Sequence, residues 1–120
     1  MLTQQKAFNK VWKKFIVDKA PFAFDKKENI CVNLTEKGAR CAAASLVPVK
    51  TLKSWGKNGG TTGSVDNFLN TQHKLSTIFI NKLRTCHDGS QRSDNKKNPR
   101  REMKLRLQSL ARDFKLIIPK

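Results

Sequence analysis

The chain has 120 residues, of which 38% are hydrophobic, and this length and composition fit one folded domain, residues 1–120. Its 25 lysines and arginines outnumber its 9 acidic residues, and the net charge of +16 divides evenly between residues 1–60 and 61–120. No stretch is apolar enough for a transmembrane helix, and lysines interrupt the apolar residues of the N-terminus, so we expect neither a membrane partner nor a secretion signal. A basic, cytoplasmic protein is predicted.

An amphipathic helix is predicted within the first twenty residues. At about 100° per residue, Phe8, Val11 and Phe15 share one side of this helix. Thr3 is placed to cap its N-terminus, and Pro21 is placed to end it. The opposite side is either a solvated outer face or a phosphate contact. Its lysines are Lys6, Lys10, Lys13 and Lys14.

Residues 22–47 predict a small antiparallel β-meander. Short apolar runs at 22–25, 30–34 and 39–47 alternate with turn residues, as strands of such a sheet do. The third run is either a strand or a short helix, because the alanines within residues 41–44 favour helix.

A brief helix and a glycine-rich loop follow the meander. Val49, Leu52 and Trp55 recur every three residues before Gly56, which predicts a helical turn that ends at a glycine. Residues 56–64 contain four glycines. Because no Gly-Lys-Ser/Thr sequence follows them, a plain loop is favoured over a Walker phosphate loop.

Two longer helices complete the predicted fold. The first begins at Ser64 and ends at residues 87–90, and a basic polar loop at 89–98 follows it. Asn98 supplies an N-cap and Pro99 a first-turn proline for the second helix. The predicted fold class is therefore α+β, with an N-terminal helix, a small β-meander and two longer C-terminal helices packed on it.

Positive charge is densest at residues 92–106, where seven of fifteen side chains are lysine or arginine. Such a density points to phosphate, because anionic partners relieve the repulsion among the cations. The chain has no tyrosine, and most phenylalanines fall on core faces, so we expect nucleic-acid binding (DNA or RNA) that is largely independent of sequence. The predicted binding residues are Lys10, Lys13, Lys14, Arg92, Lys96, Lys97, Arg100, Arg101, Lys104 and Arg112.

Metal and cofactor chemistry find little support in the sequence. No two cysteines or histidines have the close spacing of structural zinc ligands, and the odd number of cysteines favours buried, reduced thiols. We predict no metal and no cofactor. The residues weighed for a zinc site are Cys31, Cys41, Cys86, His73 and His87.

A nuclease is the enzyme that the sequence comes nearest to. Asp94 followed by Glu102 and Lys104 has the order of a restriction-type nuclease site, in which the Glu-x-Lys pair lies on a core strand. In this chain the pair falls on a predicted helix, which turns the two side chains to different sides. A non-enzymatic protein is therefore predicted.

The order of Cys31, residues 38–42 (Gly-Ala-Arg-Cys-Ala), Pro48 and the pair His87-Asp88 resembles a family of small uncharacterised proteins from bacteriophage and bacterial genomes. The family pattern has a glycine soon after its second cysteine, where this chain has Ala44-Ser45. The resemblance implies no activity, cofactor or catalytic residue. It implies that Cys41, His87 and Asp88 are structural anchors, and that the chain comes from a phage or mobile element.

This origin gives an alternative function, a small phage-encoded protein that binds and inhibits a host protein. An acidic surface on the host protein would meet the same basic side chains, and Leu105 and Leu116, on the outer side of the last helix, would supply the apolar contact. Both functions place the protein in the cytoplasm of a bacterial or phage-infected cell.

Overall fold

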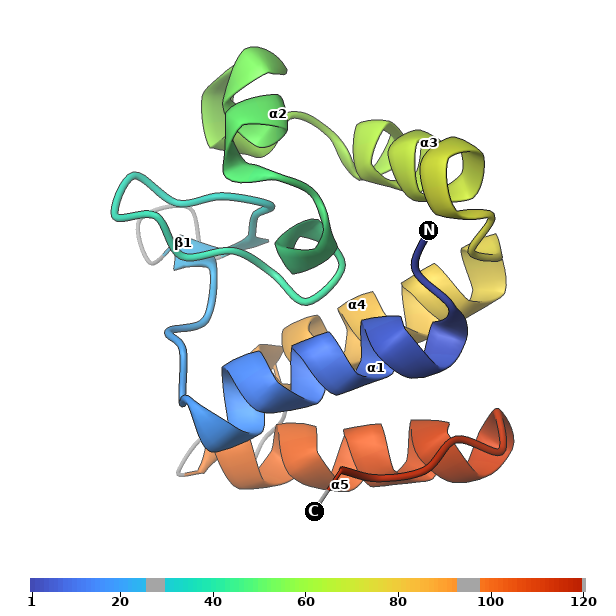
Figure 1. The fold of residues 1–120 in the computed structure, drawn as a ribbon. Coiled ribbons are helices and arrows are strands. Elements are labelled where there is room, and N and C mark those ends of the chain that lie inside the picture. Colours follow the sequence, from blue (N-terminus) through green and yellow to red (C-terminus); the bar gives the residue numbers. More distant parts are fainter. Residues whose placement is uncertain (26–29, 93–97, 120) are drawn as a thin grey trace.

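Helices form most of the framework in the computed structural model (Figure 1). The structure describes residues 1–25, 30–92 and 98–119. Helix α1 runs alongside α5, and α4 packs against α5. The helices are α1 (Gln4–Trp12), its π-helical continuation η1 (Lys13–Val17), the 3-10 turns η2 (Ala44–Leu46) and η3 (Lys57–Gly59), α2 (Val49–Ser54), α3 (Thr62–His73), α4 (Thr77–Arg92) and α5 (Pro99–Asp113).

The predicted α+β fold with a β-meander is wrong. Strands β1 (Phe24–Asp25) and β2 (Ile30–Cys31) form a ladder of two antiparallel pairs, and one isolated bridge joins Leu34 to Arg40. Residues 41–47 are turns that include η2. In the described part of the chain, this short strand pairing holds a loop in place and does not form a sheet on which helices could pack.

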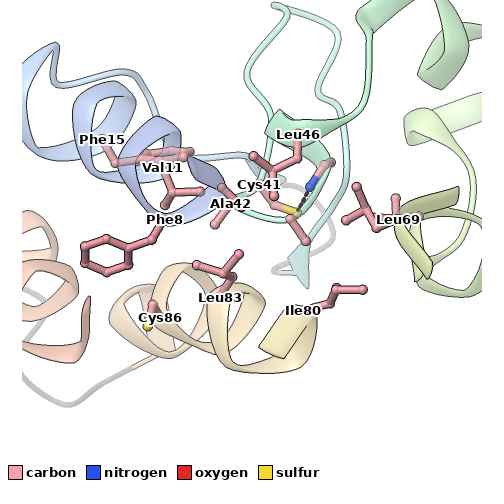
Figure 2. Packing of buried hydrophobic residues seen from close by; sticks show 14 of the residues in the cluster. Phe8, Val11, Phe15, Cys41, Ala42, Leu46, Leu69, Ile80, Leu83 and Cys86 are labelled. Atoms are coloured by element: carbon pink, nitrogen blue, oxygen red, sulfur yellow. Dashed lines mark hydrogen bonds between the residues drawn. The ribbon is translucent and has the colours of Figure 1, made fainter. Parts of the chain in front are cut away.

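Small side chains explain why the third run, for which a strand and a short helix were both open, forms helical turns and not a strand. Residues 42–44 are three fully buried alanines, and Ala42 lies beside Val11 of helix α1 (Figure 2). The turn makes hydrogen bonds within its own backbone; the Ser45 N–H, for example, donates to the Cys41 carbonyl oxygen at 2.8 Å. Alanine favours this helical conformation and lets the turn come close to α1.

The first helix agrees with its prediction. The Thr3 hydroxyl accepts the Lys6 N–H at 3.1 Å, which confirms the N-cap, and the predicted apolar side is buried. The helical path ends at Val17, short of Pro21, and Lys19 has a left-handed φ of 54°. The chain therefore turns before it reaches the proline.

The predicted long helix from Ser64 is two helices, α3 and α4. Lys74 ends α3 with a left-handed φ of 54°, and its N–H donates to the Leu69 carbonyl oxygen. The Ser76 hydroxyl then accepts the Phe79 N–H at 3.2 Å, as an N-cap of α4 does. Two local hydrogen bonds thus stop one helix and start the next.

The Asn33 side chain helps to hold the glycine-rich loop to the rest of the protein. Asn33 donates from its amide nitrogen toward the carbonyl oxygens of Gly59, Gly60 and Thr61, at 3.2, 3.1 and 3.0 Å. Both glycines have positive φ, which a residue with a Cβ rarely adopts. Thr61, and not Ser64 as predicted, caps α3 by accepting the Ser64 N–H at 3.2 Å.

Helix α4 continues through residues 87–90, where its end was predicted, as far as Arg92. Gly89 does not end the helix. It lies where α4 comes close to α5. A Cβ placed on Gly89 would lie 2.8 Å from the Arg106 Nη1. The missing side chain therefore leaves room for the guanidinium of the neighbouring helix.

Helix α5 begins as predicted. The Asn98 side chain accepts the Arg101 N–H at 3.1 Å, and Pro99 occupies the first turn. Beyond the helix, the tail turns back toward α1, where the Gln5 side-chain amide bonds both the N–H and the carbonyl oxygen of Ile117, each at 2.8 Å. The buried residues of α5 are Met103, Leu107, Leu110 and Ala111.

Replacing Lys74 by glycine should stabilise the protein. Glycine adopts the left-handed conformation without the steric cost of a Cβ, so we expect Lys74→Gly to raise the free energy of unfolding by about 1 kcal/mol. The measurement is urea unfolding followed by circular dichroism. Lys82→Gly, at an exposed position within α4, is the matched control and should lower stability by about 1 kcal/mol. A loss of stability in both variants would contradict the assignment of Lys74 as a left-handed helix end.

Candidate functional site

Three of the predicted binding residues form one exposed row on α5. Arg101, Lys104 and Arg112 lie outside the buried face of the helix, and all three side chains are exposed. None makes an ion pair with a residue in the described part of the chain. We call these three residues the α5 row.

The predicted lysines of the first helix occupy a different flank. Lys10 is exposed, Lys13 pairs with Asp18 at 2.8 Å on the surface, and Lys14 is half-buried. Gln5, which bonds the C-terminal tail, lies about 180° around the helix from Lys14. On the helical wheel, Lys14 therefore lies on the side of the first helix away from the tail contact.

Arg100 is engaged by the protein itself. Its Nη1 donates to the carbonyl oxygens of Phe15 and Ala20 at 2.6 and 3.0 Å, and its guanidinium carbon lies 4.8 Å from the centre of the Phe22 ring. Burial lowers the pKa of this arginine. Arg100 thus joins the start of α5 to the end of η1 by hydrogen bonds and a cation–π contact.

Three further predicted binding residues cannot be placed on either flank. Lys96 and Lys97 lie outside the described residues, as does the side chain of Arg92.

Arg40 is a basic residue that the sequence did not single out. Burial lowers the pKa of Lys14, and the nearby charge of Arg40 lowers it further. Arg40 is itself half-buried, its pKa is lowered by burial, and its Nη1 donates to the Val47 carbonyl oxygen at 3.1 Å. The two residues are 26 positions apart, so no local pattern could have paired them.

A second cluster combines three side chains of the kind that bind metals or carry out catalysis. One ligand atom from each of Cys31, His87 and Asp88 lies within 4.8 Å of the other two. His87 is fully buried, with its ring between Phe15 and Phe22 at centroid distances of 5.6 and 5.2 Å. The pair His87-Asp88 belongs to α4, and Cys31 belongs to β2.

The hydrogen bonds of His87 decide what this cluster can do. The backbone N–H of Ala23 donates to His87 Nε2 at 3.0 Å, so Nε2 carries no proton. His87 Nδ1 then carries the proton and donates to Asp88 Oδ1 at 2.7 Å. Binding a metal at Nδ1 would move the proton to Nε2, where it would face the N–H of Ala23. Binding one at Nε2 would displace that N–H.

Both ring nitrogens of His87 are therefore used in holding the fold. The arrangement leaves no lone pair for a metal or for taking a proton from the Cys31 thiol. This geometry fits a structural anchor that joins the segment before β1 to α4.

The two buried cysteines have the character of core residues. Burial raises the pKa of Cys41 to about 11, and the Ala44 N–H donates to its sulfur at 3.4 Å (Figure 2). Burial also raises the pKa of Cys86 to about 12. Both thiols are protonated at neutral pH and are poor nucleophiles.

A shallow cavity of about 160 Å³ lies between α4 and α5. Its charged side chains are Lys82, Arg106 and Asp113, and Arg106 already pairs with Glu102 at 3.1 Å. This mixture of signs favours neither an anion nor a cation.

Comparisons with known proteins add no relative. No protein-family model, curated protein or solved structure gives a significant match to the chain. Among the described residues, no helix is both long and apolar enough to cross a membrane.

Removing the hydrogen bonds of His87 should destabilise the fold. His87→Phe keeps an aromatic ring but leaves the buried N–H of Ala23 without an acceptor, so we expect a loss of about 1–3 kcal/mol in unfolding free energy. Asp88→Asn keeps an oxygen that accepts from Nδ1 and should cost less. Chemical unfolding of both variants makes the comparison, and equal losses would contradict the role of the Ala23 bond.

Lowering the pH should destabilise the folded protein through protonation of His73. Burial lowers the pKa of His73, helped by the N-terminal ammonium and Lys10, and its Nδ1 accepts the Leu2 N–H at 2.9 Å. The neutral form is thus favoured in the folded state, so its stabilisation is present above the ordinary pKa of 6.5 and is lost as the pH falls through 6.5 toward the lowered value.

His73→Asn removes this titration and keeps an acceptor. Unfolding free energies measured between about pH 7.5 and 5 should fall more steeply in the wild type than in the variant. If the unfolding free energies of the wild type and of His73→Asn fall equally with pH, His73 does not cause the pH dependence.

Proposed function

We propose that the protein binds nucleic acid without catalysis and largely without regard to sequence, and that the α5 row contacts the phosphate backbone. The observation that carries this proposal is that Arg101, Lys104 and Arg112 are exposed on one side of a helix and form no ion pair with a carboxylate in the described part of the chain. Phosphate contacts need cations of this kind, spaced along a rigid element.

The charge balance of the whole molecule supports the proposal. In the described part, only three lysines or arginines pair with a carboxylate, namely Lys13, Arg84 and Arg106. With a net charge of +16, most cations therefore have no internal counterion. A polyanion would find this surface quickly, because a large net charge of opposite sign steers association.

The surroundings of the aromatic rings argue against recognition of nucleic-acid bases by stacking. No phenylalanine or tryptophan in the described part is fully exposed; Trp55, for example, packs edge-on against Phe68 at 6.1 Å. Proteins that read single-stranded bases use exposed rings for stacking. Contacts limited to phosphate give affinity without sequence preference.

A second candidate function is the binding of a host protein, and the exposure of Leu105 favours it. This side chain is 53% exposed between the basic residues of the α5 row. Leu116, the other predicted contact, is half-buried and packs against the core, so it adds less apolar surface. An interface on this face would centre on Leu105.

Neutralising the α5 row should remove salt-sensitive binding. For the wild type, about five phosphate contacts give a log–log slope of affinity against salt of roughly −4. Arg101→Gln, Lys104→Gln and Arg112→Gln together should make the slope shallower by about three, since each lost contact removes about one counterion.

The matched control is the triple change Lys50→Gln, Lys53→Gln and Lys57→Gln, which lowers the net charge equally at exposed lysines in and after α2. Fluorescence anisotropy with a labelled duplex and a labelled single strand measures both variants. Equal losses in the two triple variants would show that net charge, and not the α5 row, governs binding. Absence of binding by the wild type at low salt would contradict the function itself.

Leu105→Ala separates the two candidate functions. Nucleic-acid affinity should be unchanged in this variant, because phosphate contacts need no apolar centre. If the partner is a protein, Leu105 should act as a hot spot whose loss costs about 2 kcal/mol or more of binding. A nuclease-treated lysate in which one protein is retained by the wild type and lost from Leu105→Ala would favour the second function.

A further inference from the structure

The cavity between α4 and α5 is a feature that the proposed function does not use. Its volume is about 160 Å³, whereas a single water needs on the order of 10–15 Å³, so the cavity has room for a small organic molecule. Lys82, Arg106 and Asp113 line it together with uncharged residues from both helices. These are Thr85 and Cys86 of α4 and Ser109 and Leu110 of α5.

Two contacts show how the helices face each other across this cavity. Near the start of α4 and just after the end of α5, the ring centroids of Phe79 and Phe114 lie 5.2 Å apart. Near the other end of α4, the guanidinium of Arg106 lies against Gly89. Since the order of these contacts is reversed between the two helices, α4 and α5 are antiparallel.

One end of the cavity carries two opposite charges that do not pair. Lys82 follows Phe79 closely on α4 and Asp113 directly precedes Phe114, so both residues lie at the end of the cavity marked by the two rings. Both residues are exposed, and neither forms an ion pair within the described part of the chain. At the other end, Glu102 already balances the charge of Arg106 at 3.1 Å. The cavity therefore offers one cation and one anion to a ligand.

We propose that this cavity binds a small zwitterion of the α-amino acid class, with the carboxylate of the ligand at Lys82 and its ammonium at Asp113. A simple anion would be repelled by Asp113 and a simple cation by Lys82, whereas a zwitterion is attracted by both residues. The hydroxyls of Thr85 and Ser109 both donate and accept hydrogen bonds, so they suit either charged group of the ligand.

The floor of the cavity favours an aliphatic side chain on the ligand. Cys86 and Leu110 are only 4% and 2% exposed, so they lie beneath the exposed charged residues. Burial raises the pKa of Cys86 to about 12, and its protonated thiol behaves as a small apolar group at neutral pH. An apolar surface with a few polar groups around it is typical of sites for small molecules. Valine, with a short apolar side chain, has the required combination of groups.

The experiment measures binding of L-valine to the full chain through backbone amide chemical shifts in two-dimensional NMR. We expect a dissociation constant of about 1 mM, as is reasonable for a ligand of this size, with the largest shifts around Thr85 and Ser109. N-acetyl-L-valine lacks the ammonium, and L-valine amide lacks the carboxylate. Each should bind about tenfold more weakly, because each leaves one charged residue of the cavity without its partner.

Two single variants assign the two charges. Lys82→Gln should abolish the preference for L-valine over L-valine amide, since it removes the cation that recognises the carboxylate. Asp113→Asn should abolish the preference for L-valine over N-acetyl-L-valine. Lys50→Gln changes an exposed lysine of α2 that does not line the cavity, so this matched control should keep both preferences. Circular dichroism checks that each variant is folded.

The outcomes test the site independently of nucleic-acid binding, because neither Lys82 nor Asp113 belongs to the α5 row. Loss of one preference in each cavity variant, with both preferences kept in Lys50→Gln, would support the site. An absence of shifts at about twenty times the expected dissociation constant would overturn it, since the two charged residues would then not hold a zwitterion. Equal binding of all three compounds by the wild type would overturn it as well, and so would unchanged preferences in both cavity variants.

Discussion

The packing of α1 against α5 on one flank and against the η2 turn on another governs the rest of the structure. The buried face of α1 belongs to the core. Fully buried alanines let the η2 turn approach α1 closely, and Arg100 at the start of α5 donates to the Phe15 and Ala20 carbonyl oxygens near the end of the first helix. Core packing thus decides which cations the fold engages and which it leaves exposed.

A scarcity of carboxylates shapes how the protein holds its arginines. With 9 acidic residues for 25 basic ones, main-chain oxygens take the place of counterions at Arg100 and at Arg40. The Phe15 carbonyl lies in the last turn of η1 and the Ala20 carbonyl lies just beyond it, where the helix dipole is negative, so a cation is favoured there. Carbonyl contacts therefore hold both arginines without an acidic partner.

Sequence patterns predicted the elements that depend on local chemistry. The N-caps Thr3 and Asn98 and the buried face of α1 follow from helical period and hydrogen-bonding side chains, and the structure agrees with them. The prediction of a β-meander is wrong because an alternation of apolar and polar residues over a few positions does not distinguish a strand from a buried turn of alanines. The prediction of one long helix is wrong at Lys74, because no sequence signal marks a lysine that adopts the left-handed conformation. In the site, charge density pointed to residues 92–106, but only tertiary contacts distinguish the exposed Arg101 from the engaged Arg100.

The contrast between His87 and the basic surface bears on the kind of function this fold can support. Catalytic side chains need a lone pair or a proton that the fold leaves available, and both nitrogens of His87 are already used for the Ala23 and Asp88 bonds. The cations of the α5 row have the opposite property, since no carboxylate in the described part of the chain pairs with them. His87 thus stabilises the interior, while the α5 row presents its donors to solvent. This difference follows from which hydrogen-bonding groups the fold has satisfied.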